Sequence, residues 1–329
     1  MELKKMRVML NELEAKILQG YEITEQEAYR LGELPGSYIF DLLATSGRVT
    51  RLYGGRRVEL CSIVNARSGL CSEDCAFCAQ SAHHRTNIQT YPLLPAEDVL
   101  RQAAKMEEAG VKRFSLVTSG RGIGRRDLEK VLETVRLLRR ETNLHICASL
   151  GIIGESEAKM LVEAGVATYH HNLESAAEYY PSICTTHDYR ERVQTIKAAV
   201  RAGLRVCAGG IMGMGETMAH RVQLALELRE LGIDSVPLNF LNPVPGTPLA
   251  HLTAPSPLEM LQVVAIFRLV LPRAVIRLCG GRREGLRGTQ AIAFTSGVNG
   301  LMVGDYLTTR GGALAEDIQL LRDLALEIV

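Results

Sequence analysis

Four times along this chain of 329 residues, a helical stretch ends at a glycine that leads into a short apolar run. Because glycine readily adopts the left-handed conformation that closes a helix, this recurrence marks joints between helices and strands. The joints lie at Gly110, Gly165, Gly203 and Gly232, before the runs 113–117, 167–172, 205–211 and 235–240. Further strand candidates are 58–65, 144–150, 274–278 and 301–303. Eight strands that alternate with helices predict an α/β protein, a (β/α)8 barrel of the TIM type.

The first fifty residues precede this alternation and have a helical pattern of their own. Thr24 and Glu27 have the spacing of a capping box at a helix start. We therefore predict an N-terminal helical extension over residues 1–50 and one catalytic barrel domain over residues 51–329.

The composition excludes several classes of protein. A net charge of +1 gives no attraction to nucleic acids or acidic membranes. Residues 1–20 mix charged and apolar side chains without a small-residue cleavage site, so they predict an amphipathic helix and not a signal peptide. The apolar stretch 258–271 is interrupted by Glu259, Gln262 and Arg268, which excludes a membrane span. Neither a nucleic-acid partner nor a membrane is expected.

The strongest chemical signal is a group of three cysteines, Cys71, Cys75 and Cys78, in a C-x3-C-x2-C pattern. Three thiolates this close can hold one cubane iron–sulfur cluster and leave one iron open to a small molecule. The alternative is a zinc site completed by His83 or His84, although zinc cysteines more often come as two separated pairs. The chain has eight cysteines, but three at metal spacing without a secretion signal favour metal ligation in a reducing cytoplasm over disulfides.

The cysteine segment, including Phe77 before the last cysteine, resembles that of the radical S-adenosylmethionine (SAM) enzymes. The resemblance implies a [4Fe–4S] cluster on Cys71, Cys75 and Cys78, with SAM on the fourth iron. One electron from that cluster then cleaves SAM to a 5′-deoxyadenosyl radical, which abstracts hydrogen from an unactivated carbon. The cysteines follow the first strand, at the face of a barrel where active sites form.

Over residues 55–315 the resemblance extends to the biotin synthase family. In the segment 169–174, Asn172 matches an asparagine between SAM and dethiobiotin, and Glu174 stands where an aspartate holds the SAM ribose. His170 replaces a usual asparagine near the substrate. The resemblance implies that Arg113 and Arg192 reach the SAM carboxylate region, although Arg192 alone would be a solvated helix residue.

Two further segments carry the resemblance. The stretch 209–216 is similar to a glycine-rich segment that packs near SAM, which assigns Gly209, Ile211 and Gly213 to SAM binding. Asn239 matches an asparagine that binds the ureido group of the substrate. Taken alone, the glycines indicate only a turn and Asn239 only a cap at a strand end.

Members of this family hold a second, sacrificial [2Fe–2S] cluster with three cysteines and an arginine. Cys147, Cys207 and Arg277 match three of these positions, but the fourth is Ser115, a hard and poor ligand for iron–sulfur clusters. Cys61 and Cys279 lie on other odd-numbered strands, and side chains in one barrel layer come from alternate strands. We therefore predict an auxiliary cluster, [2Fe–2S] or larger, on Cys61, Cys147, Cys207 and Cys279 beside Arg277.

The alternative to such a cluster is that these buried cysteines act only as small hydrophobic residues of the core. Cys184 has no predicted partner and is interpreted as structural.

The leading hypothesis is sulfur insertion into dethiobiotin by a radical SAM sulfurtransferase. Maturases and mutases that share the barrel need no interior cysteine layer, and a non-catalytic iron–sulfur carrier would ligate its cluster fully. The chemistry implies an electron donor of the flavodoxin or ferredoxin type, and the family resemblance suggests a homodimer.

Overall fold

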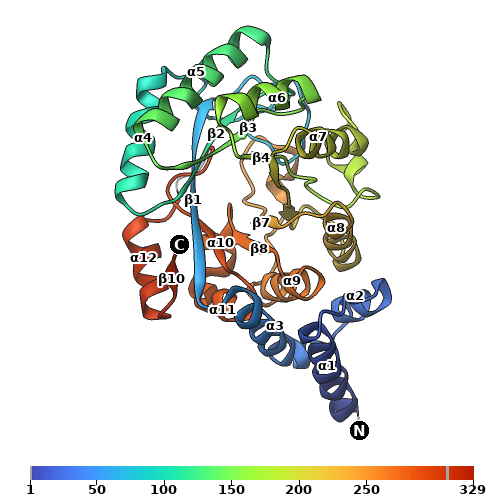
Figure 1. Ribbon diagram of the computed structural model, residues 1–329. Helices are drawn as coiled ribbons and strands as arrows, with labels where there is room; N and C mark the ends of the chain where they lie inside the picture. The colour runs from blue at the N-terminus through green and yellow to red at the C-terminus, as the bar shows by residue number, and fades with distance from the viewer. Residues whose placement is uncertain (1, 309–310) are drawn as a thin grey trace.

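The computed structural model describes residues 2–308 and 311–329, which form a closed barrel of parallel strands surrounded by helices (Figure 1). The predicted (β/α)8 barrel is confirmed. Pairing of β9 with β1 closes the barrel, and β10 pairs with the start of β1. The strands are β1 (Arg57–Arg67), β2 (Arg113–Thr118), β3 (His145–Ser149), β4 (Thr168–His170), β5 (Arg205–Cys207), β6 (Gly210–Met212), β7 (Ser235–Phe240), β8 (Val275–Leu278), β9 (Gly300–Met302) and β10 (Glu327–Ile328).

The fifth predicted strand, 205–211, is divided into β5 and β6 by a local break at Ala208 and Gly209. A β-carbon on Gly209 would lie 1.9 Å from the carbonyl oxygen of Pro237, so only glycine allows this close approach. The Gly209 carbonyl accepts hydrogen bonds from the backbone N–H groups of Leu173 and Glu174. The break therefore ties the segment after β4 to the barrel wall.

Helices cover the outside of the barrel. They are α4 (Ala96–Glu108), α5 (Arg125–Glu141), α6 (Glu155–Ala164), α7 (Tyr189–Arg201), α8 (Met218–Glu230), α9 (Pro257–Val270), α10 (Arg282–Leu286), α11 (Gln290–Ser296) and α12 (Leu314–Asp323). Short 3-10 helices span Gly36–Tyr38, Tyr180–Ser182, Pro248–His251 and Arg287–Thr289. All four joint glycines have positive φ, as the sequence pattern predicts. Among the described helices, none has the length and apolar character needed to cross a membrane.

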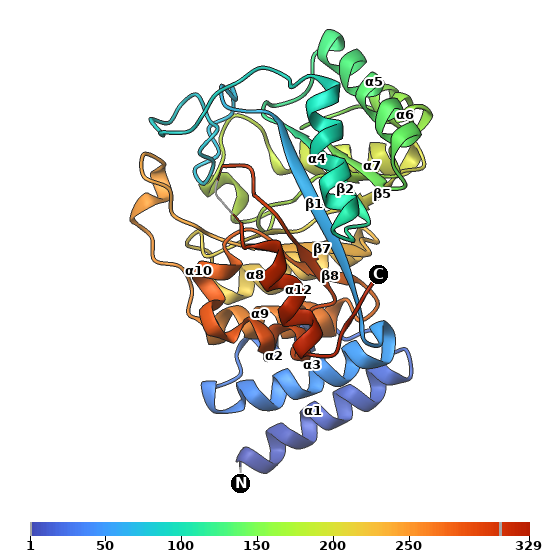
Figure 2. The same cartoon turned by 90° about the vertical axis from the view of Figure 1, so that its left-hand side faces the viewer.

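Three helices precede the barrel: α1 (Glu2–Leu18), α2 (Glu25–Gly32) and α3 (Ile39–Gly54). The capping box of Thr24 and Glu27 is present at the start of α2. In Figure 2 these blue helices lie at the bottom of the molecule, at the end of the barrel opposite the cyan loop that follows β1. The predicted boundary between residues 50 and 51 falls inside α3, and the division into two domains stays a prediction.

Alternation along β1 shows how the strands divide core from cavity. Val58, Leu60 and Val64 are buried against the surrounding helices, whereas Cys61 and Ile63 line a cavity inside the barrel. Successive side chains of a strand point to opposite faces. One face therefore packs in the hydrophobic core, and the other carries the side chains that line the cavity. The site is therefore built on the inward positions of the strands.

Candidate active site

A cavity of about 420 Å³ lies inside the barrel, and both groups of cysteines line it. The first group is the cysteine loop, Cys71, Cys75 and Cys78, and the second is the cysteine layer, Cys61, Cys147, Cys207 and Cys279. All eight cysteines of the chain are free. The structure therefore brings together the two sets of ligands that the sequence predicts and places them around one common space.

The cysteine loop holds its shape through its own backbone. The Cys71 N–H donates to the carbonyl of Gln80 at 2.9 Å, and the Cys78 N–H donates to that of Cys75 at 2.9 Å. The rings of His83 and His84 bond to the carbonyl oxygens of Ser72 and Cys78, both at 2.9 Å. Neither histidine of the zinc interpretation lines the cavity that the three cysteines share, which favours a site of three thiolates.

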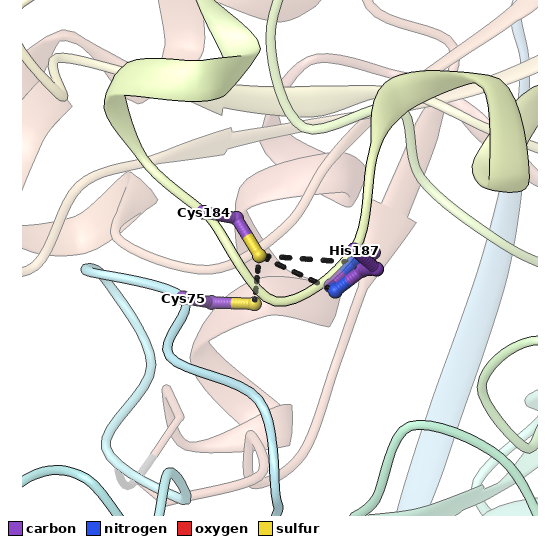
Figure 3. A group of neighbouring side chains, drawn as sticks. All are labelled: Cys75, Cys184 and His187. Atoms are coloured by element: carbon purple, nitrogen blue, oxygen red, sulfur yellow. Dashed lines mark hydrogen bonds between the residues drawn. The ribbon is translucent and has the colours of Figure 1, made fainter.

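The surroundings of Cys75, which no pattern in the sequence indicated, include Cys184 and His187 (Figure 3). The Cys75 thiol donates to Cys184 Sγ at 3.7 Å, and His187 Nδ1 lies 3.3 Å from Cys184 Sγ. This hydrogen bond from Cys75 lowers the pKa of Cys184 to about 4 and raises the pKa of Cys75. Cys184, which had no predicted partner, therefore contacts one of the predicted cluster ligands.

A buried polar chain continues from His187 to the predicted SAM residues. Tyr180 donates its hydroxyl to His187 Nε2 at 2.7 Å and accepts from Arg192 Nε at 2.6 Å. Arg192 also donates to the carbonyl of Asn172 at 2.8 Å and lies 3.7 Å from the Glu174 carboxylate. Arg192 is 8% exposed, so it is a buried part of the cavity wall and not a solvated helix residue.

Asn172 and Glu174 are placed together on the segment after β4. The Asn172 amide donates to Glu174 at 3.2 Å, and its oxygen accepts from the N–H of Gly209 at 3.0 Å. Glu174 has a positive φ of 69°, an uncommon conformation for a residue other than glycine. These contacts hold one carboxylate and one amide at the wall of the cavity. The predicted contact of Glu174 with the SAM ribose stays a prediction.

The glycine-rich stretch contributes mainly backbone packing. Ile211 lines the cavity together with Phe77. Gly213 has a φ of 99°, and its N–H donates to the buried carboxylate of Glu216 at 2.7 Å. The predicted SAM contacts of Gly209 and Gly213 stay predictions, because the close contacts of both residues are to other parts of the barrel wall.

The cysteine layer is formed by four barrel strands or their ends. Cys61 lies on β1, Cys147 on β3, Cys207 on β5, and Cys279 directly follows β8. Burial raises the pKa of Cys61 and Cys279, and it raises that of Cys147 to about 12. The thiols of Cys61, Cys147 and Cys279 therefore favour their neutral form, and a metal would have to displace their protons. Cys207 differs: burial opposes its charge, but His170 beside it outweighs burial and lowers the pKa of Cys207.

Positive charge lies beside the layer. Arg277 is 3% exposed and donates to the Glu59 carbonyl at 3.1 Å and carboxylate at 3.2 Å. Burial opposes its charge, but the neighbouring Cys61 and Cys207 outweigh burial and raise the pKa of Arg277. A buried guanidinium among four cysteines favours an anionic occupant, as a cluster on thiolates would be.

Arg113 belongs to this layer and not to the cysteine loop. It pairs with Cys61 in the β1–β2 register, and its Nε lies 2.9 Å from the Glu59 carboxylate. Arg192 contacts Tyr180 and Asn172, whereas Arg113 lies near the start of β2 and also lines the cavity. The predicted contact of Arg113 with the SAM carboxylate stays a prediction. Glu59, which joins Arg113 to Arg277, had no signal in the sequence beyond its place on a strand.

The predicted substrate residues His170 and Asn239 line the same cavity as the two cysteine groups. Burial opposes a charge on His170, but Cys207 beside it outweighs burial and raises the pKa of His170. Asn239 donates to the Gly210 carbonyl at 3.4 Å, and its oxygen accepts from the Gly280 N–H at 3.0 Å. Both residues line the cavity. Their contact with substrate stays a prediction.

The donor sets fit the groups that the sequence implies. Soft thiolates are the ligands that iron–sulfur clusters require, and the two sets face the same cavity. Three buried polar atoms at this cavity, Ser115 Oγ, Thr118 Oγ1 and His171 Nε2, have no hydrogen-bond partner among the described residues.

A barrel with three clustered cysteines after its first strand defines the radical SAM class. A family model described as "Radical SAM superfamily" matches residues 67–228, and one described as "Biotin and Thiamin Synthesis associated domain" matches residues 237–327. A methylornithine synthase structure (PylB) has a TM-score of 0.83 at 20% identity and covers 96% of this chain and 97% of its own. A maturase of the [FeFe]-hydrogenase (HydG) has a TM-score of 0.84 at 16% identity, covering 98% and 76%. At these identities the two structures show the fold alone.

Curated relatives define the family more closely. A biotin synthase from Pelotomaculum thermopropionicum is 55% identical and covers 98% of this chain and 100% of its own length. A biotin synthase from Desulforudis audaxviator is 51% identical and covers 99% and 100%. The chain belongs to the biotin synthase family of radical SAM enzymes, which confirms the resemblance seen in its sequence.

Proposed function

We propose that the protein converts dethiobiotin to biotin by radical insertion of sulfur, with the sulfur supplied by an auxiliary cluster on the cysteine layer. One observation carries the proposal: a single cavity joins three loop cysteines at one end to four strand cysteines and Arg277 deeper in the barrel. An enzyme that only generates radicals needs the first set. A second set of soft ligands beside the substrate space is what a sulfur donor requires.

The cysteine loop would hold the [4Fe–4S] cluster and the adjacent residues would hold SAM. When bound, the two supply a 5′-deoxyadenosyl radical that abstracts hydrogen from the substrate. Arg192, fixed by Tyr180 and the Asn172 carbonyl, presents a buried positive charge for the SAM carboxylate. Glu174 offers a carboxylate for ribose hydroxyls, held in place by the Asn172 amide. Phe77 and Ile211 supply apolar surface at the same wall.

The cysteine layer would hold the auxiliary cluster, with Cys61, Cys147, Cys207 and Cys279 as ligands. Arg277 and Arg113 balance its negative charge and share the carboxylate of Glu59. Asn239 would bind the ureido group of dethiobiotin, because two backbone groups fix its amide at the cavity wall. A flavodoxin- or ferredoxin-type donor, a homodimer and a cytoplasmic location complete the proposal on the strength of the family.

Isotope labelling tests the origin of the sulfur. Both clusters are assembled anaerobically with ³⁴S-sulfide, excess sulfide is removed, and a single turnover is run with SAM, reductant and dethiobiotin. Biotin that carries ³⁴S is expected, as is 5′-deoxyadenosine in excess over biotin because two hydrogens are abstracted. Deoxyadenosine formed without labelled biotin would contradict sulfur insertion from the layer.

A further inference from the structure

Cys75, Cys184 and His187 form a second possible ligand set that shares one cysteine with the loop. Their side-chain donor atoms all lie within 4.8 Å of one another, and all three residues are buried (Figure 3). Cys184 and His187 come from the segment between the 3-10 helix Tyr180–Ser182 and α7, far from Cys75 in sequence. The fold therefore creates this group by bringing two loops together.

The spacing of these atoms is that of a tetrahedral metal site. Usual zinc–ligand bond lengths at tetrahedral angles place two sulfurs ~3.8 Å apart and a sulfur and a nitrogen ~3.6 Å apart. The observed distances are 3.7 Å between Cys75 Sγ and Cys184 Sγ, and 3.3 Å between Cys184 Sγ and His187 Nδ1. Small shifts would therefore be enough to admit a metal ion.

The surroundings supply a fourth ligand and an outer partner. The Glu73 carboxylate lies 2.5 Å from His187 Nδ1, so an ion that displaces the shared proton meets a carboxylate oxygen there. Glu73 is 5% exposed and is also held by the Thr186 hydroxyl at 2.8 Å. His187 Nε2 lies 2.7 Å from the Tyr180 hydroxyl, which can orient the ring once its other nitrogen binds metal.

We propose that Cys75, Cys184 and His187, completed by Glu73, bind one thiophilic divalent cation, with zinc as the expected ion, in chains whose loop carries no iron–sulfur cluster. Two thiolates, one imidazole and one carboxylate are a donor set that zinc accepts. The cation replaces the protons of the Cys75 thiol and of His187 Nδ1, and Cys184 binds it as a thiolate. Because Cys75 cannot serve both occupants, zinc and the [4Fe–4S] cluster exclude each other. Cys184 does not line the cavity, so it is not a ligand for the open iron that faces SAM.

Cobalt, a spectroscopic substitute for zinc, tests the site in the full chain after removal of iron under anaerobic, reducing conditions. We expect Cys184→Ser, which conserves size, to lose one thiolate-bound equivalent of Co²⁺ or to bind it at least ~100-fold more weakly, given what even outer-shell changes cost. Cys71→Ala is the matched control, because a site made of the three loop cysteines needs Cys71 and not Cys184. The interior cysteines are unchanged in both variants. The proposal would be overturned if Cys184→Ser kept the thiolate-bound equivalent of Co²⁺, or if Cys71→Ala lost it.

Competition gives a second readout. Zinc bound beforehand is expected to slow assembly of the loop cluster severalfold in the wild-type chain, followed by the absorbance of the cluster as it forms. Cys184→Ser should lose this delay while reaching the same final cluster content, which also shows that the variant is folded. An equal delay in both chains would contradict a site that depends on Cys184.

Discussion

The cysteine loop and the cysteine layer use the same ligand atom but are built in opposite ways. The loop draws Cys71, Cys75 and Cys78 from eight consecutive residues held by local backbone hydrogen bonds. The layer draws its cysteines from four barrel strands or their ends, so tertiary structure alone brings them together. The loop directly follows β1, whereas the layer lies on the barrel wall beside the buried Arg277. Under the proposed function, local ligands would suit a cluster that binds SAM, and dispersed ligands would suit a sulfur source inside the barrel.

The largest effect is expected from removing a loop ligand. Cys78→Ala should abolish both deoxyadenosine and biotin, a loss beyond the ~100-fold typical of outer-shell changes, because nothing replaces the missing thiolate. The iron content should fall by about four atoms per chain, while the cysteine layer keeps the iron of its own cluster. Iron analysis and a SAM cleavage assay check this. Loss of all iron would show that the two regions do not assemble independently.

Removing a layer ligand should separate the two activities. Cys207→Ala is expected to abolish biotin formation while deoxyadenosine is still produced, because the loop stays intact. Ser235→Ala is the matched control: Ser235 donates a hydrogen bond to Cys207 Sγ at 3.3 Å, and its loss should lower the rate only about 10-fold. Parallel assays of biotin and 5′-deoxyadenosine show whether the two activities separate. Normal biotin formation by Cys207→Ala would remove the layer from the mechanism.

An intermediate effect is expected at the substrate space between the two regions. Asn239→Ala should raise the KM for dethiobiotin about 10- to 100-fold, the cost of one or two lost buried hydrogen bonds. The KM for SAM, measured in the same assay, serves as the internal control and should change little. Equal increases for both would indicate a general loosening of the cavity.

The smallest effect concerns the pH dependence of stability at the layer. Burial opposes the charge on Glu59, but Arg113 and Arg277 outweigh burial and lower its pKa below the ordinary value of 4.5. A lowered folded-state pKa means that this carboxylate stabilises the fold above its ordinary pKa and that the contribution is lost as the pH falls. Glu59→Gln should therefore flatten the decrease of unfolding free energy below pH 4.5, measured by urea titration. An unchanged slope would contradict the assigned ion pairs.

The sequence predicted the barrel and the loop well because both are encoded locally. Glycine joints mark four of the eight predicted strands, and three cysteines in one segment need no tertiary structure to converge. Resemblance to the family pointed to Arg113, Arg192, Asn172 and Glu174, which all line the cavity, but residue matching alone does not show what each side chain contacts. Arg113 pairs in register with Cys61 and contacts Glu59, and its contact with SAM stays a prediction.

Cys184 shows the other limit of the sequence. It lies 109 positions from Cys75, and no periodicity links the two loops. A histidine three residues later was a weak signal, because Cys184 and His187 lie on an irregular segment and only the fold shows their common neighbour. Long-range contacts between loops are the part of this site that local patterns do not contain.

Iron and sulfide analysis of anaerobically reconstituted protein, followed by single turnover with SAM, reductant and dethiobiotin, tests the central claim most directly. Well over the four irons of one cubane, biotin formed and sulfide consumed are the predicted result. About four irons per chain, with deoxyadenosine but no biotin, would contradict a second cluster on the layer and leave only the radical SAM site.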